Sequence, residues 1–264
     1  MHTADLEAVL VRHIREVFPE VRAILLWGSV LQPDTAWVGG VPGEAMHHAP
    51  GDVDVILVLP YDLTDPEHVH AIQVRLTRLA SRFTAVCGIE LDAAVMSPEQ
   101  LPTGPISFLV ESGLYPAHGM LQYLLKNESK VIYGDASVVD AIPYIALQDA
   151  LRSMLPSISA IVAKLRTELS ISQEAVDTSA LCTKHLPALL VLTRIIYSAD
   201  TGQIGSKMQA LDHVCTLYPQ YGRLISLLKA IYERRALTGD ALKVSGGDVG
   251  LYLDLVDEVA RRLL

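Results

Sequence analysis

Gly51-Asp52-Val53-Asp54-Val55-Ile56-Leu57-Val58-Leu59 is the stretch that decides the fold of this chain, an apolar run that opens with two acids one residue apart. A β-strand shows every second residue on the same face, so Asp52 and Asp54 point the same way at the start of a strand suited to a core. Two carboxylates side by side repel each other unless something neutralises them. A divalent cation is the usual answer, and Mg2+ takes oxygen ligands while keeping positions free for substrate phosphates. The run therefore predicts a strand with a metal site at its beginning.

Two further segments extend this pattern. Upstream, the apolar residues 23–27 stop abruptly at Gly28-Ser29, which indicates a strand followed by a turn. Downstream, residues 88–96 have the composition of another strand, in which Glu90 and Asp92 share one face. The sequence thus offers a third acid for the same site, with two candidates for it.

A strand with a Gly-Ser turn, an Asp-x-Asp strand and a later acidic strand together resemble the core pattern of the polymerase-beta-like nucleotidyltransferases. The resemblance implies that the backbone amides and the hydroxyl of Gly28-Ser29 hold the phosphates of a nucleotide. It also implies that Asp52 and Asp54 are paired metal ligands and that Asp92 is the third carboxylate. An Asp-x-Asp beside an apolar strand is a weak signal alone, so the inference depends on the three segments together.

The chemistry implied by the resemblance is transfer of a nucleoside monophosphate. Two Mg2+ ions would be held by the three aspartates, and ATP would be the co-substrate. Asp92 or Glu90 would take the proton from an acceptor hydroxyl as general base. The hydroxyl would then attack the α-phosphorus, and pyrophosphate would leave.

The segment between the Gly-Ser turn and the paired aspartates is longer than most of that superfamily uses. Its Pro- and Gly-rich composition over residues 30–51 is typical of a loop. It could be an ordered lid or a disordered insertion, and the composition favours the insertion slightly. Trp37 could stack on a ring, and His47-His48 could contact phosphate.

Composition limits the classes of protein that this chain can belong to. It has 264 residues, half of them hydrophobic, which suffices for one large domain or two small ones. No apolar run approaches the roughly 18–20 residues of a membrane span, and the N-terminus does not resemble a secretion signal. Cys87, Cys182 and Cys215 are odd in number and lack a Cys-x-x-Cys pair, so they predict buried thiols in a reducing cytoplasm. We therefore expect a cytoplasmic protein without membrane contact.

The net charge of the chain limits the kinds of partner that it is expected to bind. The net charge is −9, and the chain has no basic block with which to neutralise the phosphates of a duplex. Template-directed polymerase activity and duplex binding are therefore not expected. An acidic surface suits a cationic small molecule better, because a cleft lined with one sign of charge concentrates ligands of the other.

The order of predicted elements indicates an α+β fold. Strands alternate with helices over the first half, including a helix over residues 62–82 with Asp65 as its cap and Pro66 in its first turn. From about Ile142 onward the pattern is almost all helical, with helices expected over residues 145–170, 174–199, 207–218, 221–235 and 249–264. Pro156 and Pro187 should kink or split the first two. We expect a nucleotidyltransferase-type domain with a small mixed sheet and flanking helices over residues 1–138, and a helical bundle over 139–264.

The helical half carries a closer resemblance. Residues 192–207 contain a helix ending in Tyr, then Thr-Gly-x-Ile and a Lys that opens the next helix, and so resemble the streptomycin/spectinomycin (aminoglycoside) adenylyltransferases. The resemblance implies that Lys207 reaches the triphosphate across an interdomain cleft and that Tyr232 contacts the nucleotide. His118 falls near a nucleotide-contacting acid of that family. The alternatives are a solvated Lys207, a core Tyr232 and a His118 that caps a helix.

The acceptor is less well defined. That family holds a cationic antibiotic with acids, one of them shortly before the apolar helix, where this chain has Lys184 and His185. A Lys or His at this place would repel a cationic aminocyclitol, so the chemistry could carry over while the acceptor does not. The expected function is AMP transfer from ATP to a small molecule in the cleft, an aminoglycoside-like antibiotic among the candidates. The alternatives are a protein or RNA acceptor, as in antitoxin-type AMPylation, and a non-catalytic nucleotide-binding module. The oligomeric state does not follow from the sequence.

Overall fold

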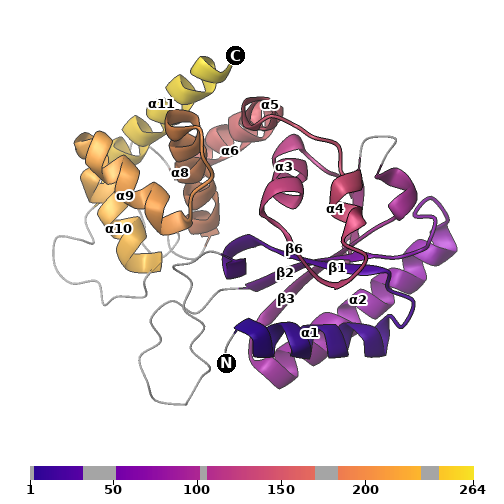
Figure 1. The fold of residues 1–264 in the computed structure, drawn as a ribbon. Helices are drawn as coiled ribbons and strands as arrows, with labels where there is room; N and C mark the ends of the chain where they lie inside the picture. The colour runs from indigo at the N-terminus through magenta and orange to yellow at the C-terminus, as the bar shows by residue number, and fades with distance from the viewer. Residues whose placement is uncertain (1–2, 32–51, 102–105, 170–183, 233–243) are drawn as a thin grey trace. The chain divides into compact units, whose positions relative to one another are not determined.

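The computed structural model describes residues 3–31, 52–101, 106–169, 184–232 and 244–264, which belong to two compact units, Met1–Ala146 and Leu147–Leu264. The first unit is a mixed sheet with helices, and the second is helical in its described part (Figure 1). The predicted α+β class, a small mixed sheet followed by a helical bundle, is confirmed. The predicted boundary between residues 138 and 139 stays a prediction, because a domain is defined by independent folding.

The sheet of the first unit has the strand order β5-β4-β3-β2-β1-β6. Its central strands pair in mixed directions, β1 with β2 antiparallel and β2 with β3 parallel. The six strands are β1 (Ala23–Trp27), β2 (Asp52–Val58), β3 (Glu90–Met96), β4 (Ser107–Val110), β5 (Gly113–Pro116) and β6 (Lys130–Gly134).

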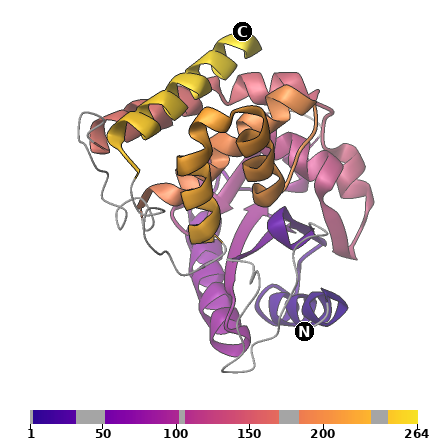
Figure 2. The same ribbon diagram turned by 90° about the vertical axis from the view of Figure 1, so that its left-hand side faces the viewer.

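Each face of the sheet is covered by its own helices, as both views show (Figures 1 and 2). One core contains alternate residues of the central strands, such as Val53 and Leu57, with apolar side chains of α1 (Thr3–Val17) and α2 (Pro66–Cys87). The other core contains the intervening residues, such as Ile56, with side chains of α3 (Gly119–Glu128) and α4 (Ser137–Ala141). This alternation follows from the two-residue period of a strand.

Helix α2 is the crossover that the parallel pair β2 and β3 requires. Asp65 caps it by accepting a hydrogen bond from the amide of Glu67 at 2.9 Å, and Pro66 occupies the first turn, as the sequence predicts. The helix ends later than predicted, at Gly88, whose φ of 67° is the left-handed conformation that terminates helices.

The hairpin of β4 and β5 was not predicted from the sequence. Each strand has four residues, and β5 ends in Pro116, so neither shows a clear two-residue pattern. After β3 the chain forms the 3-10 turn η2 (Pro98–Gln100), and strand β6 follows helix α3.

The described helices of the second unit match the predicted order. Pro156 and Pro187 lie in the first turns of α6 and α8, where proline is tolerated, so the predicted helix over residues 145–170 is split before α6. Helix α11 packs against α6 and α8 (Figure 2). The helices are α5 (Leu147–Ser153), α6 (Leu155–Glu168), α8 (Leu186–Thr201), α9 (Lys207–Leu217), α10 (Gly222–Tyr232) and α11 (Gly246–Leu263), with a 3-10 turn η4 (Pro219–Tyr221).

Four residues for which the sequence predicts a role or burial cannot be assessed. Trp37, His47-His48 and Cys182 lie outside the described residues. The prediction of buried thiols is wrong for Cys215, which is exposed, and Cys87 is partly buried. Of the helices that the structure describes, none combines the length and apolar character needed to span a bilayer.

The packing of α1 on α2 contains a buried histidine. His13 is 4 % exposed, its ring meets Phe83 edge-on, and neither ring nitrogen has a hydrogen-bond partner in the described part of the chain. Burial first, then the charges of Arg82 and Arg12, lower the pKa of His13 below its ordinary value of 6.5, against a smaller opposing effect of Glu16. The folded chain therefore binds this proton less readily than the unfolded chain, so stability falls as the pH drops below about 6.5.

His13→Leu should remove this acid sensitivity, because leucine fills the site without a titratable group. We expect the free energy of unfolding of the variant, relative to wild type, to rise when the pH is lowered from about 8 to about 5.5. Urea unfolding at the two pH values measures this, with His70→Gln on the exposed face of α2 as control. An equal effect of His13→Leu at both pH values would contradict this account.

Candidate functional site

The parallel register of β2 and β3 brings the predicted acids together. Asp52 is paired with Glu90, and Asp54 with Asp92. All four lie on the face of the sheet that continues into the core with Ile56 and Ala94. Asp52 and Asp54 are half-buried, whereas Glu90 and Asp92 are exposed. Four carboxylates are thus displayed on one patch where the two strands begin.

This patch is electrostatically unbalanced. Although Asp92 is exposed by surface area, desolvation by the surrounding chain is the first cause that raises its pKa above the ordinary range, and the charges of Asp52, Glu90 and Glu111 add to it. Glu111, which follows β4, was not predicted to lie near the site, because its position depends on the hairpin. The mutual repulsion of these acids favours a bound cation or a proton at this place.

The Gly-Ser turn lies directly against the acids. Trp27, the last residue of β1, is paired with Asp54, and Gly28 then opens the 3-10 turn η1 (Gly28–Leu31). A Cβ atom at Gly28 would lie 2.2 Å from Oδ2 of Asp54, and the φ of Gly28 is +80°. Only glycine fits this position without displacing the carboxylate. Ser29 lies in the same turn, and its side chain is outside the described residues, so its phosphate role stays a prediction.

The donor chemistry of the patch fits magnesium, which takes hard oxygen ligands. Within the described residues, no three acidic, histidine or cysteine side chains are arranged so that they could hold a metal ion by themselves. Mg2+ at nucleotide sites commonly uses one or two carboxylates with water and substrate phosphates rather than a full protein cage. The pair Asp52 and Asp54 suits that mode, and the metal role stays a prediction.

A cavity of about 660 Å³ adjoins the acids within the first unit. It lies where α2, β3 and the β4–β5 turn meet, and Glu90 and Asp92 form part of its wall. The remaining lining is rich in hydroxyl groups and contributes one more acid, with the residues Thr77, Ala80, Ser81, Thr84, Leu91, Ala93, Val110, Glu111 and Ser112. The cavity therefore offers polar, negatively charged walls next to the carboxylate patch.

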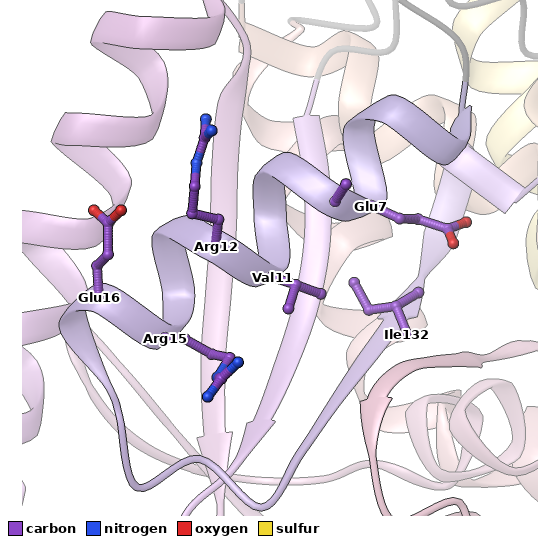
Figure 3. A pocket seen from close by; sticks show the side chains of 7 residues that line it. Glu7, Val11, Arg12, Arg15, Glu16 and Ile132 are labelled. Carbon is purple, nitrogen blue, oxygen red and sulfur yellow. The ribbon is translucent and has the colours of Figure 1, made fainter.

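A second hollow runs along α1 and contains none of the predicted site residues (Figure 3). Its charged lining is of mixed sign, and much of it already has partners: Glu7 binds Lys130 at 2.7 Å, and the guanidinium of Arg15 lies 4.9 Å from the ring centre of Tyr133. It gives no reason to expect a ligand of one charge.

In the second unit, two of the predicted nucleotide contacts lie together. Lys207 is the first residue of α9, and its Nζ lies 5.7 Å from the ring centre of Tyr232 at the end of α10. Both side chains are half-buried. The structure thus brings the two residues into one cation–π contact, and their role in binding a nucleotide stays a prediction.

His118 occupies the N-cap of α3. Its Nδ1 accepts a hydrogen bond from the amide of Leu121 at 3.1 Å, and desolvation lowers the pKa of the ring. The capping alternative is therefore confirmed, and a nucleotide contact by His118 stays a prediction.

Lys184 and His185 carry less unbalanced positive charge than their sequence position suggests. Lys184 Nζ lies 3.0 Å from Oε2 of Glu168, which balances its charge. His185 is 3 % exposed, and burial lowers its pKa more than Glu168 raises it, so the ring is neutral near pH 7. Repulsion of a cationic acceptor by these two residues is therefore weaker than the sequence indicates.

Comparison with solved structures identifies the fold. Spectinomycin adenyltransferase AAD(9) from Enterococcus faecialis, solved with ATP and spectinomycin, matches with a TM-score of 0.65 at 14% identity, over 97% of this chain and 98% of that one. At this identity the likeness shows the fold. The resemblance expected from the sequence is confirmed at that level.

Other solved structures are more distant. The tri-AMPylated Shewanella oneidensis HEPN toxin in complex with MNT antitoxin matches with a TM-score of 0.31 at 12% identity, over 63% of this chain and 94% of that one. A toxin–antitoxin complex with AMP-PNP gives 0.32 at 14% identity, over 61% and 93%. These scores are too low to support an argument. No family model and no curated protein matches the sequence.

Gly28→Ala should destabilise the first unit more than Gly88→Ala. Both glycines have left-handed backbones, but a Cβ at Gly88 meets nothing within 4 Å, whereas one at Gly28 overlaps Asp54. We expect a cost of about 1 kcal/mol for Gly88→Ala and at least about 2 kcal/mol for Gly28→Ala, measured by urea unfolding. Equal costs would show that Asp54 moves aside freely.

Proposed function

We propose that this protein is a metal-dependent nucleotidyltransferase that transfers AMP from ATP to a hydroxyl group of a small molecule and releases pyrophosphate. The observation that carries the proposal is the register that sets Asp52 and Asp54 beside Glu90 and Asp92, with Gly28 against Asp54. The fold shared with an adenyltransferase solved with ATP and spectinomycin supports it.

Asp52, Asp54 and Asp92 are the proposed metal ligands. The donor set is all oxygen, and a bound cation would offset the desolvation and the repulsion that together raise the pKa of Asp92. A pair of Mg2+ ions would supply charge stabilisation for the attacking and leaving oxygens of an in-line displacement.

The remaining proposed roles are phosphate binding, proton transfer and contact with the nucleotide. The backbone of the Gly28-Ser29 turn would hold the phosphates, since glycine lets the backbone approach a ligand closely. Asp92 would accept the proton of the acceptor hydroxyl, because it is aligned with Asp54, the acid that contacts the turn. Glu90, aligned with Asp52, is the second candidate. Lys207 and Tyr232 would bind the nucleotide through charge and ring stacking, and His118 is a further nucleotide contact by resemblance.

The acceptor would lie against the carboxylate patch. The adjoining cavity is lined by the acids Glu90, Asp92 and Glu111 and by hydroxyl groups, so it suits a cationic molecule that carries hydroxyls. An aminoglycoside-like antibiotic has this chemistry, and its modification in the cytoplasm would confer resistance.

Asp54→Asn should abolish turnover, because it removes a proposed metal ligand. Pyrophosphate release is measured with Mg2+, each of the four nucleoside triphosphates and a panel of aminocyclitol and aminoglycoside antibiotics. We expect release that needs both ATP and one acceptor and that falls at least about a thousandfold in Asp54→Asn. Asp140→Asn, an exposed acid on α4, is the matched control.

Full activity of Asp54→Asn would overturn the proposed metal site. If ATP binds but no small molecule brings about pyrophosphate release, the acceptor would instead be a protein or RNA. A wild-type chain that binds no nucleotide would overturn the proposal as a whole.

A paired substitution compares Asp92 and Glu90, the two candidates for the base. Asp92→Asn should lower kcat by about 100-fold or more, since it removes a proposed metal ligand as well as the proposed base. Glu90→Gln, aligned one pair further along the strands, should lower kcat less. The reverse order would assign the base to Glu90.

A further inference from the structure

The turn that leads into Lys207 packs against the ring of Tyr197. Helix α8 ends at Gly202, whose φ is +68°, and the chain then passes Gly205 before α9 begins. A Cβ atom at Gly205 would lie 2.6 Å from Cε1 of Tyr197 and 2.9 Å from Cδ1 and Cζ. The backbone of Gly205 therefore lies flat on the aromatic ring, a contact that no side chain other than hydrogen allows.

The ring of Tyr197 is itself held in place. The ring of His213, on α9, meets it edge-on with ring centres 5.2 Å apart. His213 Nε2 lies 3.1 Å from Oδ2 of Asp200, which also accepts a hydrogen bond from the hydroxyl of Tyr218 at 3.0 Å. The Asp200 side chain is only 9% exposed, so this arrangement is anchored in the interior of the second unit.

Hydrogen bonds to backbone groups of the same turn also hold it in place. Arg194 Nε donates to the carbonyl of Gly205 at 3.0 Å. Ser206 and Gln209 form a reciprocal capping box, in which the amide of Gln209 donates to Ser206 Oγ at 3.1 Å and the amide of Ser206 donates to Gln209 Oε1 at 2.8 Å. The start of α9, and so the Cα of Lys207, has little freedom to move.

We propose that Tyr197 and Gly205 are positioning residues that fix the first turn of α9, so that Lys207 stays beside Tyr232 at the bound nucleotide. The inference rests on the proposed function, in which Lys207 binds the triphosphate. A lysine side chain is flexible, and a rigid backbone beneath it lowers the cost of holding the ammonium at a phosphate. In catalysis, a misplacement of about 1 Å can lower the rate by up to about 100-fold, which shows how strongly such a group depends on its position.

The test is a double-mutant cycle on ATP affinity. Gly205→Ala and Lys207→Met are made singly and together, and ATP binding in Mg2+ is measured by titration calorimetry. We expect Gly205→Ala to weaken ATP binding by about tenfold when Lys207 is present, a change within the usual range for coupled neighbouring residues. In the Lys207→Met background the same change should cost less than about twofold, because the group it positions is gone.

Gly222→Ala is the matched control, since a Cβ at that position in α10 meets nothing within 4 Å. Thermal unfolding of each variant shows whether the second unit keeps its fold. If Gly205→Ala does not fold, Tyr197→Leu in the same two backgrounds gives the same comparison by removing the ring. A loss of affinity that is equal in both backgrounds, or absent in both, would overturn the inference. A wild-type chain that binds no ATP would overturn the proposed function, and the inference with it.

Discussion

The parallel pairing of β2 with β3 is the constraint on which the candidate site depends. A one-residue slip in this register would turn every side chain of one strand to the opposite face and separate the acids. The apolar residues prevent such a slip, because Val53, Val55 and Leu57 must face the core under α1 and α2. The positions of Asp52 and Asp54 are therefore fixed by the packing of their neighbours. Stability and the candidate chemistry are encoded in the same short run.

The sequence predicts what is local and periodic. The three central strands, the acids that share a face within each strand and the cap of α2 at Asp65 all follow from spacing along the chain. The pairing of Asp54 with Asp92 does not, because it depends on the register between strands that are distant in sequence. Glu111 was missed for the same reason, since only the β4–β5 hairpin brings it near Asp92.

In the second unit too, local features are predicted from the sequence and contacts between distant residues are not. The order of its helices follows from apolar periodicity and from Pro156 and Pro187. The contact of Gly205 with Tyr197 depends on how α8 returns into α9, and a glycine before a capping serine gives no local sign of it. Likewise, Lys184 is expected from sequence to be a bare charge, and its partner Glu168 becomes visible only in the fold.

Two acidic residues, one in each unit, show why the carboxylate patch differs from a structural network. Asp200 receives hydrogen bonds from Tyr218 and Arg262 and pairs with His213, so its charge is met by the protein itself. Asp92 has no such donor among the described residues, and desolvation together with the charges of neighbouring acids raises its pKa. At neutral pH that arrangement opposes folding, because the raised pKa of Asp92 in the folded chain disfavours its ionised form. A cluster of like charges without internal compensation is what a site for a cation requires, and the fold places it where β2 and β3 begin.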